Sequence, residues 1–355
     1  MKRLYIHIGH YKTGTSAIQK YCSDNARALA EAGYFYPPVA RPGNNPTNHG
    51  DLSLLLAAKH GFNPPPWYGA NGKDIETIYA AFLDSARAAR QQNILVSSEE
   101  FFQLGLRADP AAALAELKDR LAEFDVRIVL YIREPLALLK SWYNELNKGP
   151  HGTRSFPVFF RNIDPDFLAQ TSVWRRFAEA FGEPAMIVRS YKHTGLDHIR
   201  DFLAGIGCDH VPKGQDVRVQ EAQDLETLEL ARIAKRGDAD YDETTLSRFG
   251  PVQALAAKVA RINTGFAEIS ARSDMPQDSQ LSLAGLFAHH ERLIAPLVAR
   301  KCMNDKEAEI LRDAALALAP EDPAAALVLM RTAHAIRPKG PFIAQKLQEY
   351  EAAEG

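Results

Sequence analysis

A short stretch near the start of the chain combines one lysine, two glycines and three hydroxyl residues in a pattern that can hold an anion. It reads Ile6-His7-Ile8-Gly9-His10-Tyr11-Lys12-Thr13-Gly14-Thr15-Ser16. An apolar strand runs into a tight turn, and hydroxyl residues follow at the start of an amphipathic helix. The first backbone N–H groups of a helix have no acceptor within it, and they lie at the positive end of its dipole. We therefore predict a binding site for a phosphate or a similar anion, with the Lys12 ammonium beside it.

The spacing of this loop separates it from the usual ATP-binding loop, G-x-x-x-x-G-K-[ST]. Gly9 and Gly14 fit that template, and Ser16 fits its last position. Thr15, however, stands where the template has its lysine, and the lysine lies before the second glycine instead. There it can reach the group that leaves a 5′-phosphate, whereas the lysine of ATP-hydrolysing loops spans the β- and γ-phosphates. The alternative for this segment alone is a helix N-cap with a solvated lysine.

A second strand-to-helix turn carries an arginine and a serine. Residues 126–132 are apolar and β-branched, which is typical of a buried strand, and Arg133 follows them. Pro135 suits the first turn of a helix, and helical spacing continues beyond it. The guanidinium of Arg133 and the hydroxyl of Ser141, eight residues later, can close on one dianion. The alternative is an arginine paired with a neighbouring glutamate and a serine that faces water.

Together the two motifs resemble the nucleotide-binding elements of sulfotransferases that use 3′-phosphoadenosine 5′-phosphosulfate (PAPS), most closely the soluble bacterial type, over residues 1–210. The resemblance implies that the 5′-phosphosulfate is bound by Lys12, Thr13, Gly14, Thr15 and Ser16. It also implies that Arg133 and Ser141 bind the 3′-phosphate. Tyr191 follows a strand similar to the family's later core strand, which implies a place beside the adenine, although core packing explains this tyrosine equally well. The glycine-rich R-K-G-x-x-G segment of the cytosolic branch is missing.

This resemblance implies transfer of a sulfuryl group from PAPS to a hydroxyl or amine of a small-molecule, glycan or lipid-linked acceptor, with adenosine 3′,5′-bisphosphate as the product. In-line transfer needs a base for the acceptor's proton and positive charge at the departing phosphate. No metal is expected, because the sulfuryl group carries less charge than a γ-phosphate and the strand 126–132 ends in arginine, not in an acidic metal ligand. Nucleotide kinase-type phosphoryl transfer and a non-catalytic nucleotide-binding scaffold remain as alternatives.

Two residues compete for the role of the catalytic base. His49 follows an irregular loop, and the ordinary pKa of histidine suits proton removal near neutrality. Glu99 lies just past a predicted strand, where cytosolic sulfotransferases place a histidine, whereas membrane-bound members use a glutamate nearer the position of His49. We predict that His49 is the base and that Glu99 orients it or the acceptor. The alternatives are a histidine that caps a helix and a solvated carboxylate.

Strand and helix patterns alternate over the first 210 residues. Strands are predicted at 2–8, 93–98, 126–132 and 185–190, and helices at 14–31, 74–91, 110–123, 135–147 and 164–181. This alternation predicts an α/β fold with a central parallel sheet flanked by helices. Ligands of such sheets bind at the carboxyl ends of the strands, and Lys12, Glu99 and Arg133 all follow strand ends.

We predict one sulfotransferase domain over residues 1–300, with an α/β core at about 1–210 and a helical part at about 219–300. Residues 305–355 repeat alanine and leucine at helical spacing, with a Pro-Glu-Asp-Pro turn between two helices. This tail is similar to a single tetratricopeptide-like hairpin. Because a free-standing solenoid needs about three such repeats, we expect the tail to pack against the core.

The composition is ordinary for a globular protein, with 46% hydrophobic and 24% charged residues and a net charge of −2. Without a global basic field, neither nucleic acid nor an anionic membrane is an expected partner, and the oligomeric state stays open. The N-terminal apolar run is broken at His7 and Gly9, too early for a signal peptide, and no stretch reaches transmembrane length. Cys22, Cys208 and Cys302 lack metal-ligand spacing and indicate reduced thiols in a cytoplasmic protein.

Overall fold

The computed structural model of the chain describes residues 1–69, 72–133, 135–149, 170–192, 194–210, 307–320 and 323–354, with a few single residues between them. The chain divides into two compact units. An α/β unit comprises Met1–Leu138, Pro165–Gln220 and Gln277–Ala295, and a second unit comprises Leu139–Asp164, Glu221–Pro276 and Pro296–Gly355. The helical part predicted at 219–300 lies almost entirely outside the described residues, as does Cys302.

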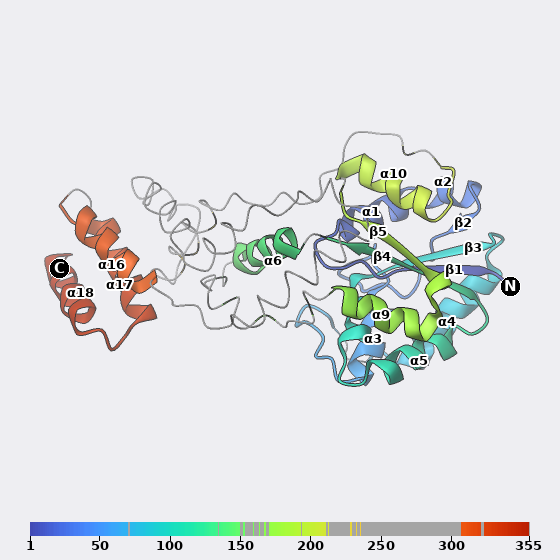
Figure 1. Ribbon diagram of the computed structural model, residues 1–355, viewed down its shortest axis with the longest axis horizontal. Helices are drawn as coiled ribbons and strands as arrows, with labels where there is room; N and C mark the ends of the chain where they lie inside the picture. Colours follow the sequence, from blue (N-terminus) through green and yellow to red (C-terminus); the bar gives the residue numbers. More distant parts are fainter. Residues whose placement is uncertain are drawn as a thin grey trace. The chain divides into compact units, whose positions relative to one another are not determined.

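Five described strands form one parallel sheet in the α/β unit, in the order β2-β3-β1-β4-β5 (Figure 1). The strands are β1 (Arg3–His7), β2 (Tyr34–Phe35), β3 (Asn93–Ser97), β4 (Asp125–Ile132) and β5 (Met186–Ser190). This arrangement confirms the predicted fold class. The strand order reverses on either side of β1, since β3 lies on one side and β4 on the other. Such a reversal opens a crevice at the carboxyl ends of the central strands, where α/β proteins bind their ligands.

Helices cover both faces of this sheet (Figure 1). One face carries α1 (Thr15–Asp24), α2 (Ala26–Glu31) and α10 (Gly195–Gly205). The other carries α3 (Gly50–Lys59), α4 (Ile75–Ala88), α5 (Pro110–Arg120) and α9 (Gln170–Phe181), together with the 3-10 helix η1 (Glu99–Leu106). A short 3-10 turn, η2 (Glu183–Ala185), leads into β5.

The elements differ from the sequence prediction at four places. The helix predicted at 14–31 is divided at Asn25, and the one predicted at 164–181 is described as α9 only from Gln170. Helix α3 was not predicted, because seven of its ten residues are buried and it therefore shows no amphipathic period. The two-residue strand β2 is too short to show alternation.

Alternate side chains of β1 pack on opposite faces of the sheet. Leu4 and Ile6 belong to the larger core cluster, with side chains from α3, α4, α5 and α9, whereas Tyr5 belongs to the cluster with α1 and α10. Because successive side chains of a strand point to opposite faces of the sheet, β1 is buried on both sides. The segment that follows β1 is thereby held at the carboxyl edge of the sheet.

The described residues of the second unit lie mainly in helices. Helix α6 (Pro135–Lys148) begins in the α/β unit and continues into the second unit. The C-terminal part contains α16 (Glu307–Leu318), α17 (Pro323–Ile336) and α18 (Pro341–Glu354), which share a core of their own around Leu311, Met330 and Ile343. The tail thus has three described helices, where the sequence pattern predicted a hairpin of two.

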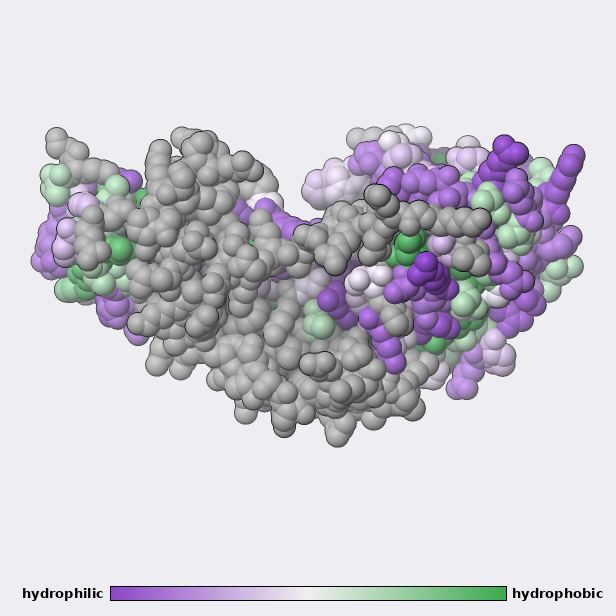
Figure 2. Space-filling model, turned by 90° about the horizontal axis from the view of Figure 1, so that it is seen from above, coloured by the Kyte–Doolittle hydropathy of each residue, from purple (hydrophilic) through white to green (hydrophobic). Residues whose placement is uncertain are grey.

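On the face drawn in Figure 2, the described surface of the α/β unit is mainly hydrophilic, with hydrophobic residues in small groups. None of the helices in the described ranges is both long enough and apolar enough to cross a membrane.

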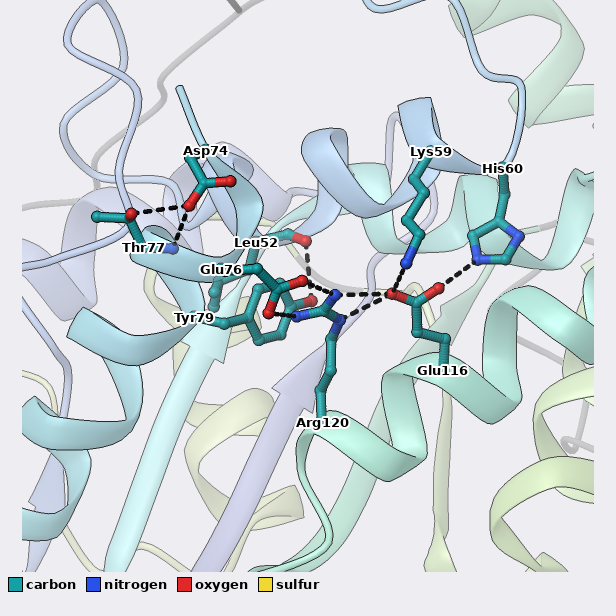
Figure 3. A network of polar contacts seen from close by, with 9 residues as sticks. All are labelled: Leu52, Lys59, His60, Asp74, Glu76, Thr77, Tyr79, Glu116 and Arg120. Carbon is teal, nitrogen blue, oxygen red and sulfur yellow. Dashed lines mark hydrogen bonds and ion pairs between the residues drawn. The ribbon is translucent and has the colours of Figure 1, made fainter. Parts of the chain in front are cut away.

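A network of ion pairs ties α3, α4 and α5 together beneath the sheet (Figure 3). The Glu116 carboxylate accepts hydrogen bonds from Lys59 Nζ at 2.7 Å and His60 Nε2 at 3.0 Å, and its Oε1 lies 2.8 Å from Arg120 Nη2. Arg120 also donates two hydrogen bonds to Glu76, at 2.6 and 3.0 Å. Burial by itself raises the pKa of Glu116, but the hydrogen bonds from Lys59, Arg120 and His60 outweigh burial and lower that pKa to about 2.

We expect Glu116→Gln to lower the free energy of unfolding by about 1–3 kcal/mol at pH 7, because three donors lose a charged acceptor. Since the folded pKa of Glu116 is depressed, this contribution is complete above the unfolded pKa and fades as the pH falls toward 2. Urea unfolding of both proteins at pH 7 and pH 3 measures it. The control is Glu123→Gln, which breaks an exposed ion pair, that of Glu123 with Arg87. Equal losses in the two variants would contradict the expectation.

Candidate functional site

The loop after β1 has the backbone geometry of an anion-binding nest. Gly9, Lys12 and Gly14 have φ angles of 61°, 64° and 74°, all in the left-handed region. Gly14 is the N-cap of α1, and among the described residues no side chain caps this helix end. The first N–H groups of α1 are therefore left to a ligand. A left-handed lysine costs roughly 1–2 kcal/mol, and strain of this kind is typical of functional loops.

Two of the predicted hydroxyl residues hold the loop in shape. Thr13 Oγ1 donates to the carbonyl of His10 at 2.6 Å and accepts from the His10 N–H at 3.2 Å. Thr15 Oγ1 donates to the same carbonyl at 3.3 Å. Both threonines are buried, whereas Ser16 is exposed at the start of α1. The hydroxyls of Thr13 and Thr15 thus bond within the loop, and a ligand would meet their backbone.

Arg133, at the end of β4, contacts this loop directly. Its Nη1 donates to the carbonyl of Lys12 at 2.5 Å. Its guanidinium carbon lies 5.2 Å from the ring centroid of Tyr191, which follows β5. Gln170 of α9 anchors the backbone of Arg133 through two hydrogen bonds of 2.8 Å. The tertiary structure therefore brings together Lys12, Arg133 and Tyr191, which are more than 50 residues apart in sequence.

Side chains from α10 and from the segment after β5 also pack closely against Gly14. A Cβ atom built on it would lie 2.6 Å from the imidazole of His198 and 3.2 Å from the ring of Tyr191. His198 is buried in α10, with ring centroids 4.8 Å from Tyr131 and 5.1 Å from Tyr191. Only glycine allows this close approach, so α10 and β5 set the position of the N-terminus of α1.

Glu99 approaches the same loop from the end of β3. A Cβ atom on Gly9 would lie 3.3 Å from the Cβ of Glu99. Glu99 Oε2 accepts from Gln19 Nε2 at 2.7 Å and from Asn48 Nδ2 at 3.3 Å. Burial and the neighbouring Glu100 carboxylate raise the pKa of Glu99 to about 8, although the charge of Lys12 lowers it in part.

The geometry argues against His49, the residue that the sequence favoured as base. His49 is fully buried, its Nδ1 accepts from the Ser97 N–H at 3.2 Å, and its Nε2 faces the carbonyl of Pro37 at 3.0 Å. An imidazole that accepts at Nδ1 and donates at Nε2 is a neutral tautomer with both nitrogens occupied. Burial lowers the pKa of His49 to about 3. In the structure His49 fastens the loop before α3 to the end of β3, and its role as the base stays a prediction that these contacts do not favour.

Sequence reasoning missed the residues that hold Glu99. Gln19 lies on the buried face of α1, with Thr15, Ile18 and Cys22, and a polar side chain among apolar ones at that spacing was an available signal. Asn48 is 1% exposed and lies before α3, and nothing in its sequence context marked it. It donates to Glu99 and to Glu100, both at 3.3 Å, so its amide bridges the two carboxylates.

Ser141 lies in the part of α6 that belongs to the second unit, so its pairing with Arg133 on one phosphate stays a prediction. Among the described residues, no group of three or more His, Cys, Asp or Glu side chains is placed to hold a metal ion. The site in the α/β unit thus consists of the loop 9–16 with Glu99, Arg133 and Tyr191 around it.

No protein-family model matches this chain, and a search of the curated proteins finds no match. Among solved structures, the chain is similar to a sulfotransferase from Alicyclobacillus acidocaldarius. The two are 16% identical, the match covers 70% of this chain and 99% of that chain, and the TM-score is 0.41. A functional assignment for this chain therefore depends on its own residues.

Proposed function

We propose that this chain is a sulfotransferase that moves a sulfuryl group from PAPS to a hydroxyl or amine of a small-molecule, glycan or lipid-linked acceptor. The observation that carries the proposal is the contact of Arg133 with the backbone of Lys12, which joins the two predicted phosphate-binding motifs at one edge of the sheet. The approach of Glu99 to Gly9 adds a carboxylate with a raised pKa beside the same loop.

The residues divide the chemistry between them. The N–H groups at the start of α1 would hold the 5′-phosphate, and Arg133 would bind the 3′-phosphate through its charged fork. PAPS would supply the sulfuryl group. Glu99 would take the proton of the acceptor as the new bond to sulfur forms, and the Lys12 ammonium would neutralise charge on the phosphate oxygen as its bond to sulfur breaks. A base with a pKa near the working pH suits this task.

Binding tests the donor. Adenosine 3′,5′-bisphosphate should raise the melting temperature of the protein without metal, and ADP with Mg²⁺ should not, because Thr15 replaces the lysine of ATP-binding loops. Stabilisation by ADP with Mg²⁺ alone would favour a nucleotide kinase. If ³⁵S-labelled PAPS binds but labels no acceptor in any cell extract, a non-catalytic scaffold would be favoured.

We expect Arg133→Ala to weaken the binding of adenosine 3′,5′-bisphosphate by about 10- to 100-fold, since charge-assisted hydrogen bonds contribute about 1.5–3 kcal/mol. Binding of adenosine 5′-monophosphate, which lacks the 3′-phosphate, should change much less. Calorimetric titration with both nucleotides measures the difference. The matched control is Arg127→Ala, on the same strand, whose guanidinium bonds the carbonyl of Pro184. A variant at Arg133 that keeps its preference for the 3′-phosphate would refute the assignment.

A further inference from the structure

His10, inside the loop, has an arrangement that a neutral imidazole cannot satisfy. Its Nδ1 lies 2.8 Å from the carbonyl oxygen of Tyr11, and its Nε2 lies 2.8 Å from the carbonyl oxygen of Phe167. A carbonyl only accepts hydrogen bonds, so both ring nitrogens must donate. A neutral imidazole has one N–H group and an imidazolium has two. The geometry around His10 is therefore that of the protonated, cationic form.

In the protein without bound nucleotide, the surroundings of the His10 ring disfavour the positive charge of an imidazolium. His10 is fully buried, and its ring packs against Phe102 and Phe167, with centroids 4.3 and 4.6 Å away. Burial lowers the pKa of His10 to about 4; the two carbonyls act in the opposite direction, and Arg133 lowers the pKa as well. One of the two short contacts is then a repulsion between lone pairs near neutral pH. The two carbonyls are thus arranged for a charge that the free site disfavours.

A bound anion would reverse this balance. Among the described residues, the charge of Arg133 acts on His10, and Lys12 lies two residues further along the same loop. Glu99 and Glu100 begin η1, the element that contributes Phe102 to the contacts of the His10 ring. Tyr11 stays neutral, since burial raises its pKa well above the ordinary value. A doubly phosphorylated nucleotide at the loop would offset the charges of Lys12 and Arg133, and it would attract a further positive charge below the loop.

We propose that His10 becomes an imidazolium when the anionic nucleotide binds, so that nucleotide binding takes up a proton. Both ring nitrogens then donate, Nδ1 to the carbonyl of Tyr11 within the loop and Nε2 to the carbonyl of Phe167, and the second hydrogen bond fastens the loop to the backbone of Phe167. His10 is then a positioning residue of the loop and supplies a positive charge without touching the nucleotide. This inference rests on the proposed function only in that it needs an anion at the loop.

The linkage between proton and nucleotide gives the sign of the effect. Because the pKa of His10 is higher with the nucleotide than without it, affinity rises as the pH falls through the bound-state pKa, by up to about tenfold per pH unit. In His10→Gln this part of the pH dependence should vanish. Glu99 can also take up a proton near an anion, so Glu99→Gln is the necessary control and should keep the contribution of His10.

Calorimetric titration with adenosine 3′,5′-bisphosphate at pH 7, in buffers of different ionisation enthalpy, counts the protons taken up. We expect His10→Gln to take up about one proton fewer than the wild type on binding the nucleotide. Glu99→Gln should still take up the proton that His10 contributes. Because His10→Gln could lose its fold, ¹⁵N NMR of histidine-labelled wild-type protein provides a second measurement. One buried imidazole should move to imidazolium shifts at both nitrogens when the nucleotide is added.

Equal proton uptake in the wild type and His10→Gln would overturn the inference, and so would a bound state in which no buried imidazole changes its shifts. In either case the nucleotide still binds and the proposed function stands. Failure of the wild type to bind the nucleotide at all would instead remove the proposed function, and with it the anion that the inference requires.

Discussion

Glu99→Gln should lower the turnover of sulfuryl transfer by about 10²- to 10⁴-fold, the usual effect of losing a general base. The substitution keeps the shape of the side chain and an oxygen for Gln19 Nε2, which donates to Glu99 at 2.7 Å. Nucleotide binding should therefore survive. A base works only when deprotonated, so wild-type turnover should rise with pH toward the pKa of Glu99, about 8. This rise should be absent in the variant.

Glu100→Gln is the matched control, because it removes the neighbouring carboxylate and leaves the base in place. Glu100 is one cause of the raised pKa of Glu99, so its loss should move the rise in turnover to lower pH. Initial rates measured from pH 6 to 9 for the wild type and both variants separate the two roles. Wild-type turnover and pH dependence in Glu99→Gln would exclude this residue as the base.

Lys12→Met should lower turnover by about 10²- to 10³-fold, as expected when one group that stabilises developing charge is removed. The departing phosphate oxygen would keep the N–H groups at the start of α1 but lose its ammonium. Affinity for adenosine 3′,5′-bisphosphate should fall by about tenfold or less, since Arg133 and the backbone still bind the phosphates. Single-turnover rates at saturating PAPS, with calorimetry for affinity, separate the two effects.

Lys20→Met serves as the control for Lys12, since it removes an exposed lysine of α1 whose ion pair among the described residues is with Asp24, at 2.9 Å. It should leave both turnover and affinity unchanged. Methionine carries the same backbone strain as lysine at position 12, where φ is 64°, so the comparison isolates the ammonium. Undiminished turnover in Lys12→Met would take this lysine out of the mechanism.

Local sequence patterns were sufficient for the main elements of the α/β unit. Four strands and the turns that follow them were predicted, because buried strands and helix starts are encoded by neighbouring residues. Helix α3 escaped because burial on almost all sides removes its amphipathic period. In the C-terminal tail, the helical spacing was evident, but α18 had not been separated from the helices before it.

The sequence by itself determined where the residues proposed to bind the anion lie along the chain: Lys12 between two glycines, and Arg133 at a strand end. Only the tertiary structure showed how the surroundings of the two candidate bases differ, since it buries His49 with both nitrogens occupied and places Glu99 against Gly9. It also showed His10 between two carbonyls, one of them 157 residues away in the chain. The reason is physical: spacing in sequence controls local backbone shape, whereas burial, hydrogen-bond partners and pKa depend on neighbours brought together by folding.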